Sequence, residues 1–112
     1  MTSTVVIAGQ LENDPQISYT RAGHAKVTLC LRTLVRGQHA SEEPMTPVVV
    51  EAVGDLAEHC AMTLTKGHRV LVAGELRINS ISESTYVEAF DVGPSLTQCT
   101  AEVHPLFEPV TS

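Results

Sequence analysis

The stretch that decides the fold is GDLAEHCAMTLTKGHRVLVAGELRI, residues 54–78 of the 112-residue chain. Its first part has helical spacing, with inward positions at Leu56, Cys60, Ala61 and Leu64. Asp55 is a suitable N-cap for this helix, and Gly67 is a suitable left-handed stop. The second part, HRVLVAGELRI, has a period of two: one set of alternating positions holds Val70, Val72, Gly74, Leu76 and Ile78, and the other holds Arg69, Leu71, Ala73, Glu75 and Arg77. The change from a period of 3.6 to a period of two predicts a helix, a tight turn and a strand.

Four further segments have strand-like sequences. They are TVVIAGQL at 4–11, a run over 26–36, VVVEAVG at 48–54 and TYVEAFDV at 85–92. Residues 17–19 are compatible with an additional brief strand between two turns. The chain thus has five main strands, with one short helix between the third and the fourth. That order predicts an all-β OB-fold, a five-stranded Greek-key barrel that binds oligonucleotides or sugars on one face.

Length and composition indicate one globular domain, because 112 residues with an apolar fraction of 43% can bury a single core. We expect the OB-fold domain to occupy residues 1–98, and residues 99–112 to form a short C-terminal tail or an add-on strand. No apolar run approaches the roughly 20 residues of a membrane helix. The N-terminus also lacks the features of a secretory signal. We therefore expect a cytoplasmic protein that does not associate with membranes.

Other residue types argue against an enzyme. Cys30, Cys60 and Cys99 are odd in number and widely spaced, which disfavours a disulfide framework or a closed zinc site. We expect them to be small buried hydrophobes. The five histidines share no metal-ligand spacing, and no nucleophile elbow or phosphate-binding loop is present. The sequence predicts no catalytic activity, no metal and no cofactor.

The charge is unevenly distributed along the chain. The formal net charge is −6, which argues against a general polyanion binder. Residues 78–112 carry five acidic residues and neither Lys nor Arg, whereas residues 15–41 carry four basic residues and no acidic one. Within the strand over 26–36, Lys26, Arg32 and Arg36 share one outward face. This face is either a solubilising surface or a strip that follows a phosphate backbone.

Three motifs follow one another in a fixed order along the chain. The first is Gly9-x-Leu11-x-x-Asp14-Pro15-x-x-x-Tyr19-Thr20-x-x-Gly23-x-Ala25. The second is Gly54-x-Leu56-Ala57-Glu58, followed by Leu64-x-Lys66-Gly67-x-x-Val70-x-Val72-x-Gly74-x-Leu76-Arg77. The third is Asp91-Val92-Gly93-Pro94-Ser95-Leu96. In their joint order and spacing, these motifs resemble bacterial single-stranded-DNA-binding proteins over residues 5 to about 98.

The resemblance implies an OB-fold domain that pairs through its first strand and forms a homotetramer around which single-stranded DNA wraps. It implies roles in DNA replication, repair and recombination, and a nucleoid-associated location in the cytoplasm. No cofactor, metal or chemistry is implied. Binding of this kind combines aromatic stacking with cationic grooves.

Several residues depart from the family pattern. The chain has no Trp, and Gly37, Pro47 and Val53 stand where the family carries aromatic residues. Ile81 or a neighbour replaces a further Trp, and Asp55 replaces a Lys. Each lost stacking platform is worth ~1–3 kcal/mol per base, so we expect weakened or altered affinity. In the tail, Phe107-Glu108 only faintly resembles the family's acidic tip, which recruits replication and repair proteins.

The candidate nucleic-acid contacts are Tyr19, Lys26, Arg32, Arg36, Lys66, Arg69, Arg77 and Tyr86. Some of them have structural alternatives. Tyr19 is either a contact or a half-buried tyrosine at the barrel edge, and Lys66 also complements the C-terminus of the preceding helix. Phe90 is a candidate stacking platform on the same strand as Tyr86, but we expect it in the core more than on the surface. Two hypotheses follow: a homotetrameric or homodimeric single-stranded-DNA-binding protein, or an OB-fold scaffold module that has lost nucleic-acid binding.

Overall fold

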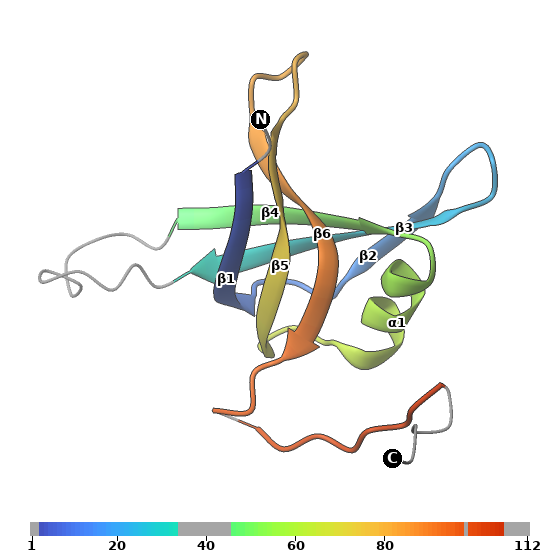
Figure 1. Ribbon diagram of the computed structural model, residues 1–112, viewed down its shortest axis with the longest axis vertical. Coiled ribbons are helices and arrows are strands. Elements are labelled where there is room, and N and C mark those ends of the chain that lie inside the picture. The colour runs from blue at the N-terminus through green and yellow to red at the C-terminus, as the bar shows by residue number, and fades with distance from the viewer. Residues whose placement is uncertain (1–2, 34–45, 98, 107–112) are drawn as a thin grey trace, which may run out of the picture.

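The computed structural model describes residues 3–33, 46–97 and 99–106, and it contains six strands and one helix (Figure 1). In chain order these elements are β1 (Ser3–Leu11), β2 (Gln16–Tyr19), β3 (Ala25–Thr33), β4 (Thr46–Val53), α1 (Asp55–Thr63), β5 (Arg69–Ile78) and β6 (Thr85–Pro94). The strand predicted over 26–36 is described only as far as Thr33, and residues 34–36 lie outside the described residues.

The strands form one sheet in the order β1-β5-β6-β4-β3-β2, and an additional pairing of β1 with β3 closes it into a barrel. The five main strands are β1, β3, β4, β5 and β6, while β2 is a short partner of β3 alone. The helix lies between the third and fourth of these main strands, as predicted. The all-β OB-fold prediction is therefore confirmed, and Figure 1 shows α1 covering one end of the barrel.

The core follows from strict alternation along the strands. On β3 the side chains of Val27, Leu29 and Leu31 are fully buried, while the residues between them face outward. Val70 and Val72 of β5 meet them from the other side of the barrel. Burying a side chain of this size stabilises the fold by about 1.5–3 kcal/mol, so this cluster fixes which face of each strand points outward.

The ends of α1 differ from the prediction. Asp55 is the first helical residue and not the N-cap; the N-cap is Gly54, and no side chain caps the helix. Gly54 has a φ of 77° and its N–H donates to the carbonyl of Ala25, a conformation that an Asp would adopt less readily. The helix ends at Thr63 with Leu64 extended, because Leu64 turns into the core. Gly67 has a φ of 92° but lies in the following turn.

Two glycines allow neighbouring strands to approach closely. At Gly74 on β5, an added Cβ would overlap the carbonyl oxygen of Glu88 on β6. Beside it β6 carries a bulge, because Gly74 pairs with Ala89 and Ala73 pairs with Asp91, which leaves Phe90 as an extra residue. At Gly9 on β1, an added Cβ would lie 2.8 Å from the carbonyl oxygen of Arg32. Close packing against the neighbouring strand thus explains why Gly9 and Gly74 carry no side chain.

Burial departs from the sequence pattern in three places. Leu76 and Ile78 share the alternation of Val70 and Val72 but are exposed, because the β5–β6 ribbon continues past the barrel there (Figure 1). Phe90 is 57% exposed because the bulge places it outside the barrel. Among the cysteines only Cys60 is buried; Cys30 is half-buried and Cys99 is exposed.

Candidate nucleic-acid interface

The exterior of β3 and β4, together with the hairpin between β5 and β6, is the region that an OB barrel uses for binding. On β3 the outward side chains include Lys26 and Arg32, and Glu51 is outward on β4. Tyr86 of β6 and Arg77 of β5 form a register pair at the base of the hairpin. The barrel therefore gathers most of the predicted contacts on its exterior, where they fall into two separate hollows.

The first hollow, which we call the Tyr86 hollow, is lined by Lys26, Glu51, Ala52, Val53, Tyr86 and Glu88 and has a volume of about 220 Å³. Tyr86 is half-buried in it, so one part of the ring is available for contact. The ammonium of Lys26 forms an ion pair with Glu51 at 2.5 Å (Nζ to Oε1). This hollow thus combines an aromatic ring with a cation whose charge is already compensated.

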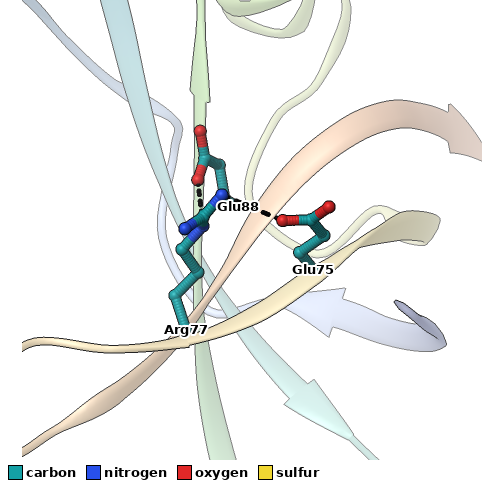
Figure 2. A network of polar contacts seen from close by, with 3 residues as sticks. All are labelled: Glu75, Arg77 and Glu88. Carbon is teal, nitrogen blue, oxygen red and sulfur yellow. Dashed lines mark hydrogen bonds and ion pairs between the residues drawn. The ribbon is translucent and has the colours of Figure 1, made fainter. Parts of the chain in front are cut away.

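Arg77 lies beside this hollow and is held by two carboxylates, as Figure 2 shows. Its Nε is 2.5 Å from Oε2 of Glu88, and its Nη2 donates to Oε2 of Glu75 at 2.9 Å. These side chains come from the two strands of the β5–β6 ribbon, and Glu75 and Glu88 are register partners. Two of the three guanidinium nitrogens, Nε and Nη2, are thereby engaged by protein carboxylates.

The second hollow, which we call the Lys66 hollow, is lined by Gln10, Leu11, Glu12, Asn13, Arg32, Lys66 and Gly67 and has a volume of about 470 Å³. Gly67 donates its N–H to the carbonyl of Leu11 at 2.9 Å, and Gln10 donates back to the carbonyl of Gly67 at 3.0 Å. Asp14 accepts the N–H of Lys66 at 2.8 Å. These bonds fix the turn that carries Lys66 against the end of β1.

The two cations of the Lys66 hollow differ in their partners. Nε of Arg32 donates to Oε1 of Glu12 at 2.7 Å, so one edge of this guanidinium is occupied. Within the described part of the chain, the ammonium of Lys66 forms no ion pair. Lys66, which the sequence analysis also assigned to the helix C-terminus, therefore has no carboxylate partner among the described residues.

The remaining predicted contacts lie apart from both hollows. Tyr19 is on β2 and is 65% exposed. Arg69 is half-buried and donates to the hydroxyl of the buried Ser95 at 3.2 Å. The N–H of Ser95 in turn donates to the carbonyl of Arg69 at 2.8 Å, which indicates a structural role at the end of β6. Arg36 lies outside the described residues.

Sequence reasoning missed the acidic residues of the interface, which are Glu12, Glu51, Glu75 and Glu88. Of these, Glu75 could be placed opposite Val70 and Val72 by the alternation of its strand, whereas Glu88 shares a face with Phe90, which was expected in the core. Their partners were not visible, because pairing across strands depends on register, and register is a property of the assembled sheet.

Other chemistry is sparse in the described residues. They contain no group of three or more His, Cys, Asp or Glu side chains that could hold a metal. Burial raises the pKa of the Cys60 thiol to about 11, so this thiol stays protonated, and thus a poor nucleophile, at neutral pH. The helix α1 has nine residues and is too short to span a bilayer, and the described part of the chain contains no helix that is longer.

A closed OB barrel whose exterior presents cations beside a tyrosine defines the class: an OB-fold protein of the oligonucleotide-binding type. The sequence model described as the single-strand binding protein family matches residues 2–92. The chain therefore belongs to the single-strand binding protein family.

Similar proteins agree with this assignment. The chain is 32% identical over 113 residues to the single-stranded DNA-binding protein of Bifidobacterium longum, covering 90% of this chain and 52% of that one. It is 29% identical over 114 residues to that of Paenarthrobacter nicotinovorans, covering 91% and 67%. The structure of the second single-stranded DNA-binding protein from Mycobacterium smegmatis aligns with a TM-score of 0.80 at 25% identity, covering 94% of this chain and all of that one.

Proposed function

We propose that the protein binds single-stranded DNA on the exterior of its barrel, as a self-associating protein of DNA replication, repair and recombination. The observation that carries this proposal is the match of the single-strand binding family over residues 2–92, on a barrel whose exterior gathers cations beside Tyr86. It acts without a cofactor or catalytic step, in the cytoplasm at the nucleoid. Residues 1–98 form the binding domain, and residues 99–112 form a short tail.

The two hollows support different contacts. Lys66 is the favoured phosphate contact because its ammonium has no ion pair in the described part of the chain, and Arg32 lies beside it in the same hollow. Tyr86 is the favoured stacking platform, since sequence-tolerant binding uses aromatic rings beside cations. Tyr19 and Arg36 stay proposed contacts from the sequence. Lys26, Arg69 and Arg77 are each bound to other protein groups, which supports the proposed weak to moderate affinity.

Self-association as a homotetramer or homodimer is supported by the exterior of β1 and β5. Val6 is 73% exposed and is the register partner of Ala73, next to the exposed Leu71, which pairs with Ala8. Adjacent apolar exposed residues on one sheet face are typical of interaction surfaces. Among the described strands, β1 pairs with β3 only at Gln10 and Leu11, so most of its outer edge is open for a second copy.

The test is titration of fluorescently labelled poly-dT with the full chain at about 0.05 M and about 0.2 M salt. Binding at the lower salt that weakens at the higher salt is expected, because phosphate contacts release counterions. Light scattering on the same samples gives the oligomeric state. Absence of binding at the lower salt would contradict the proposal, and a monomer at micromolar concentration would contradict self-association.

The second candidate function is an OB-fold scaffold that self-associates but no longer binds nucleic acid. It is favoured by the carboxylates on Lys26 and Arg77 and by the absence of Trp from the sequence. This alternative predicts a stable oligomer that does not respond to poly-dT at any salt concentration. The same titration therefore separates the two functions.

A further inference from the structure

Three glutamates lie side by side across the binding face, on three adjacent strands. Glu51 of β4 is the register partner of Glu88 of β6, and Glu88 is the register partner of Glu75 of β5. We call these three residues the carboxylate row. Like charges directly opposite each other destabilise a sheet, so the row needs nearby cations to compensate it.

The row is compensated by Lys26 and Arg77 alone among the described residues. Three carboxylates against two cations leave a local formal charge of −1 at the site where this fold binds nucleic acid. Figure 2 shows the guanidinium of Arg77 directed toward the carboxylates of Glu88 and Glu75. A phosphate at Arg77 would have to compete with both carboxylates for the charge of the guanidinium.

We propose that the carboxylate row sets the affinity for single-stranded DNA by withholding Lys26 and Arg77 from its phosphates. The inference rests on the proposed function and deepens it, since it identifies the residues that weaken binding at the same face. Bases still reach Tyr86, because stacking requires a ring and not a free charge.

Counterion release predicts how much the salt dependence of binding should change when Arg77 is freed. Each phosphate neutralised by a free cation steepens the dependence of log affinity on log salt by about 0.7 for a single strand. A cation already neutralised by a carboxylate adds nothing to this slope. Freeing Arg77 should therefore steepen the slope by about 0.7, which is about an eightfold gain in affinity at about 0.05 M salt and none near 1 M.

The experiment is a salt-dependent poly-dT titration of the double variant Glu75→Gln/Glu88→Gln. Glutamine keeps the size of the side chain and one acceptor oxygen but removes the negative charge. The double variant should show the full eightfold gain at about 0.05 M salt and the steeper slope. Each single variant should gain less than half of this on a logarithmic scale, because the remaining carboxylate still holds Arg77.

Two controls separate this effect from net charge and from unfolding. Glu58→Gln, on the exposed face of α1, makes the same charge change per substitution away from the row and should leave the slope unchanged. Adding Arg77→Ala to the double variant should abolish the gain, because the freed cation is then absent. Circular dichroism melting of every variant shows whether the barrel stays folded, and Glu51→Gln repeats the test on Lys26.

The outcomes distinguish this inference from the proposed function. If the parent chain binds poly-dT and a folded double variant binds it no better, the inference is wrong and the proposed function stands. If the gain appears but survives Arg77→Ala, the row acts only by repulsion and the inference is also wrong. If neither the parent nor the double variant binds at about 0.05 M salt, the proposed function itself has failed.

Discussion

The Tyr86 hollow and the Lys66 hollow are both on the barrel exterior and both contain two predicted cationic contacts when Arg77 is counted with the first. In the Tyr86 hollow every cation has a carboxylate partner, and Arg77 has two. In the Lys66 hollow, Arg32 has one carboxylate partner and Lys66 has none within the described residues. The difference between the hollows is therefore one of pairing and not of residue type.

An outward cation is therefore a poor indicator of a phosphate contact until its neighbours in the folded chain are known. Exposed ion pairs add little to stability, with a median of about 0–1 kcal/mol. They nevertheless remove the counterion release on which single-strand binding depends. The same pair can thus matter little for the fold and much for the function.

The largest expected effect is a loss of stability when alanine replaces a glycine that lies against a residue of one of the hollows: Gly74 contacts Glu88 of the Tyr86 hollow, and Gly9 contacts Arg32 of the Lys66 hollow. Gly74→Ala should lower the free energy of unfolding by about 3 kcal/mol, because the added Cβ would overlap the carbonyl oxygen of Glu88. Gly9→Ala, behind the Lys66 hollow, should cost about 1 kcal/mol, because its Cβ lies 2.8 Å from the carbonyl of Arg32. Urea unfolding of both variants measures the difference, and equal costs would show that β5 and β6 can separate freely at the bulge.

The next effect is on DNA affinity, and it compares the unpaired cation of the Lys66 hollow with the paired cation beside the Tyr86 hollow. Lys66→Ala should lower poly-dT affinity about eightfold at about 0.05 M salt and flatten the salt slope by about 0.7, since its ammonium has no ion pair in the described part of the chain. Arg77→Ala is the matched variant in the other region and should leave the slope unchanged. Equal slopes for Lys66→Ala and the parent chain would remove the distinction between the hollows.

A smaller effect is expected at the aromatic ring. Tyr86→Leu should lower affinity about fivefold, the lower end of the stacking range, because Tyr86 is half-buried and offers only part of its ring. Tyr86→Phe keeps the ring and should bind like the parent chain. If the leucine and phenylalanine variants bind equally well, the Tyr86 hollow contacts no base.

The smallest effect concerns the contribution of the ion pairs to stability. Lys26→Met keeps the apolar stem of the side chain and removes its pair with Glu51, so it should change the free energy of unfolding by no more than about 1 kcal/mol. Thermal melting of this variant is the measurement. A loss well above that value would mean that the carboxylate row is part of the structural core of the barrel.

Much of the fold could be predicted from the sequence because alternation is local. The period-two pattern in Val70, Val72 and Gly74 identified β5 and its inward face, and the change of period identified α1. The errors occur where tertiary geometry overrides the local pattern. Leu76 and Ile78 continue the alternation but extend beyond the barrel, where there is no core to bury them.

The candidate site could be predicted only as a set of residue types. Lys26 and Arg77 were found because outward positions on a strand can be counted. Their partners could not be found, because Glu51 and Glu88 come together through the parallel pairing of β4 with β6, which no local signal encodes. The prediction of Asp55 as the N-cap of α1 was wrong for a similar reason. Gly54 takes that position, and its N–H donates a hydrogen bond to the carbonyl of Ala25, which is distant in the sequence.

The pairing of β1 with β5 also has a consequence for how the chain folds. β1 is made first, yet its partners run from Arg69 opposite Gln10 to Leu76 opposite Ser3. During synthesis this apolar strand must wait for most of the barrel to leave the ribosome before it can pair. Such distant contacts carry a large loop-closure entropy and slow folding. We therefore expect the pairing of β1 with β5 to form late in folding, and until it forms β1 presents an open edge that is prone to pair with the wrong strand.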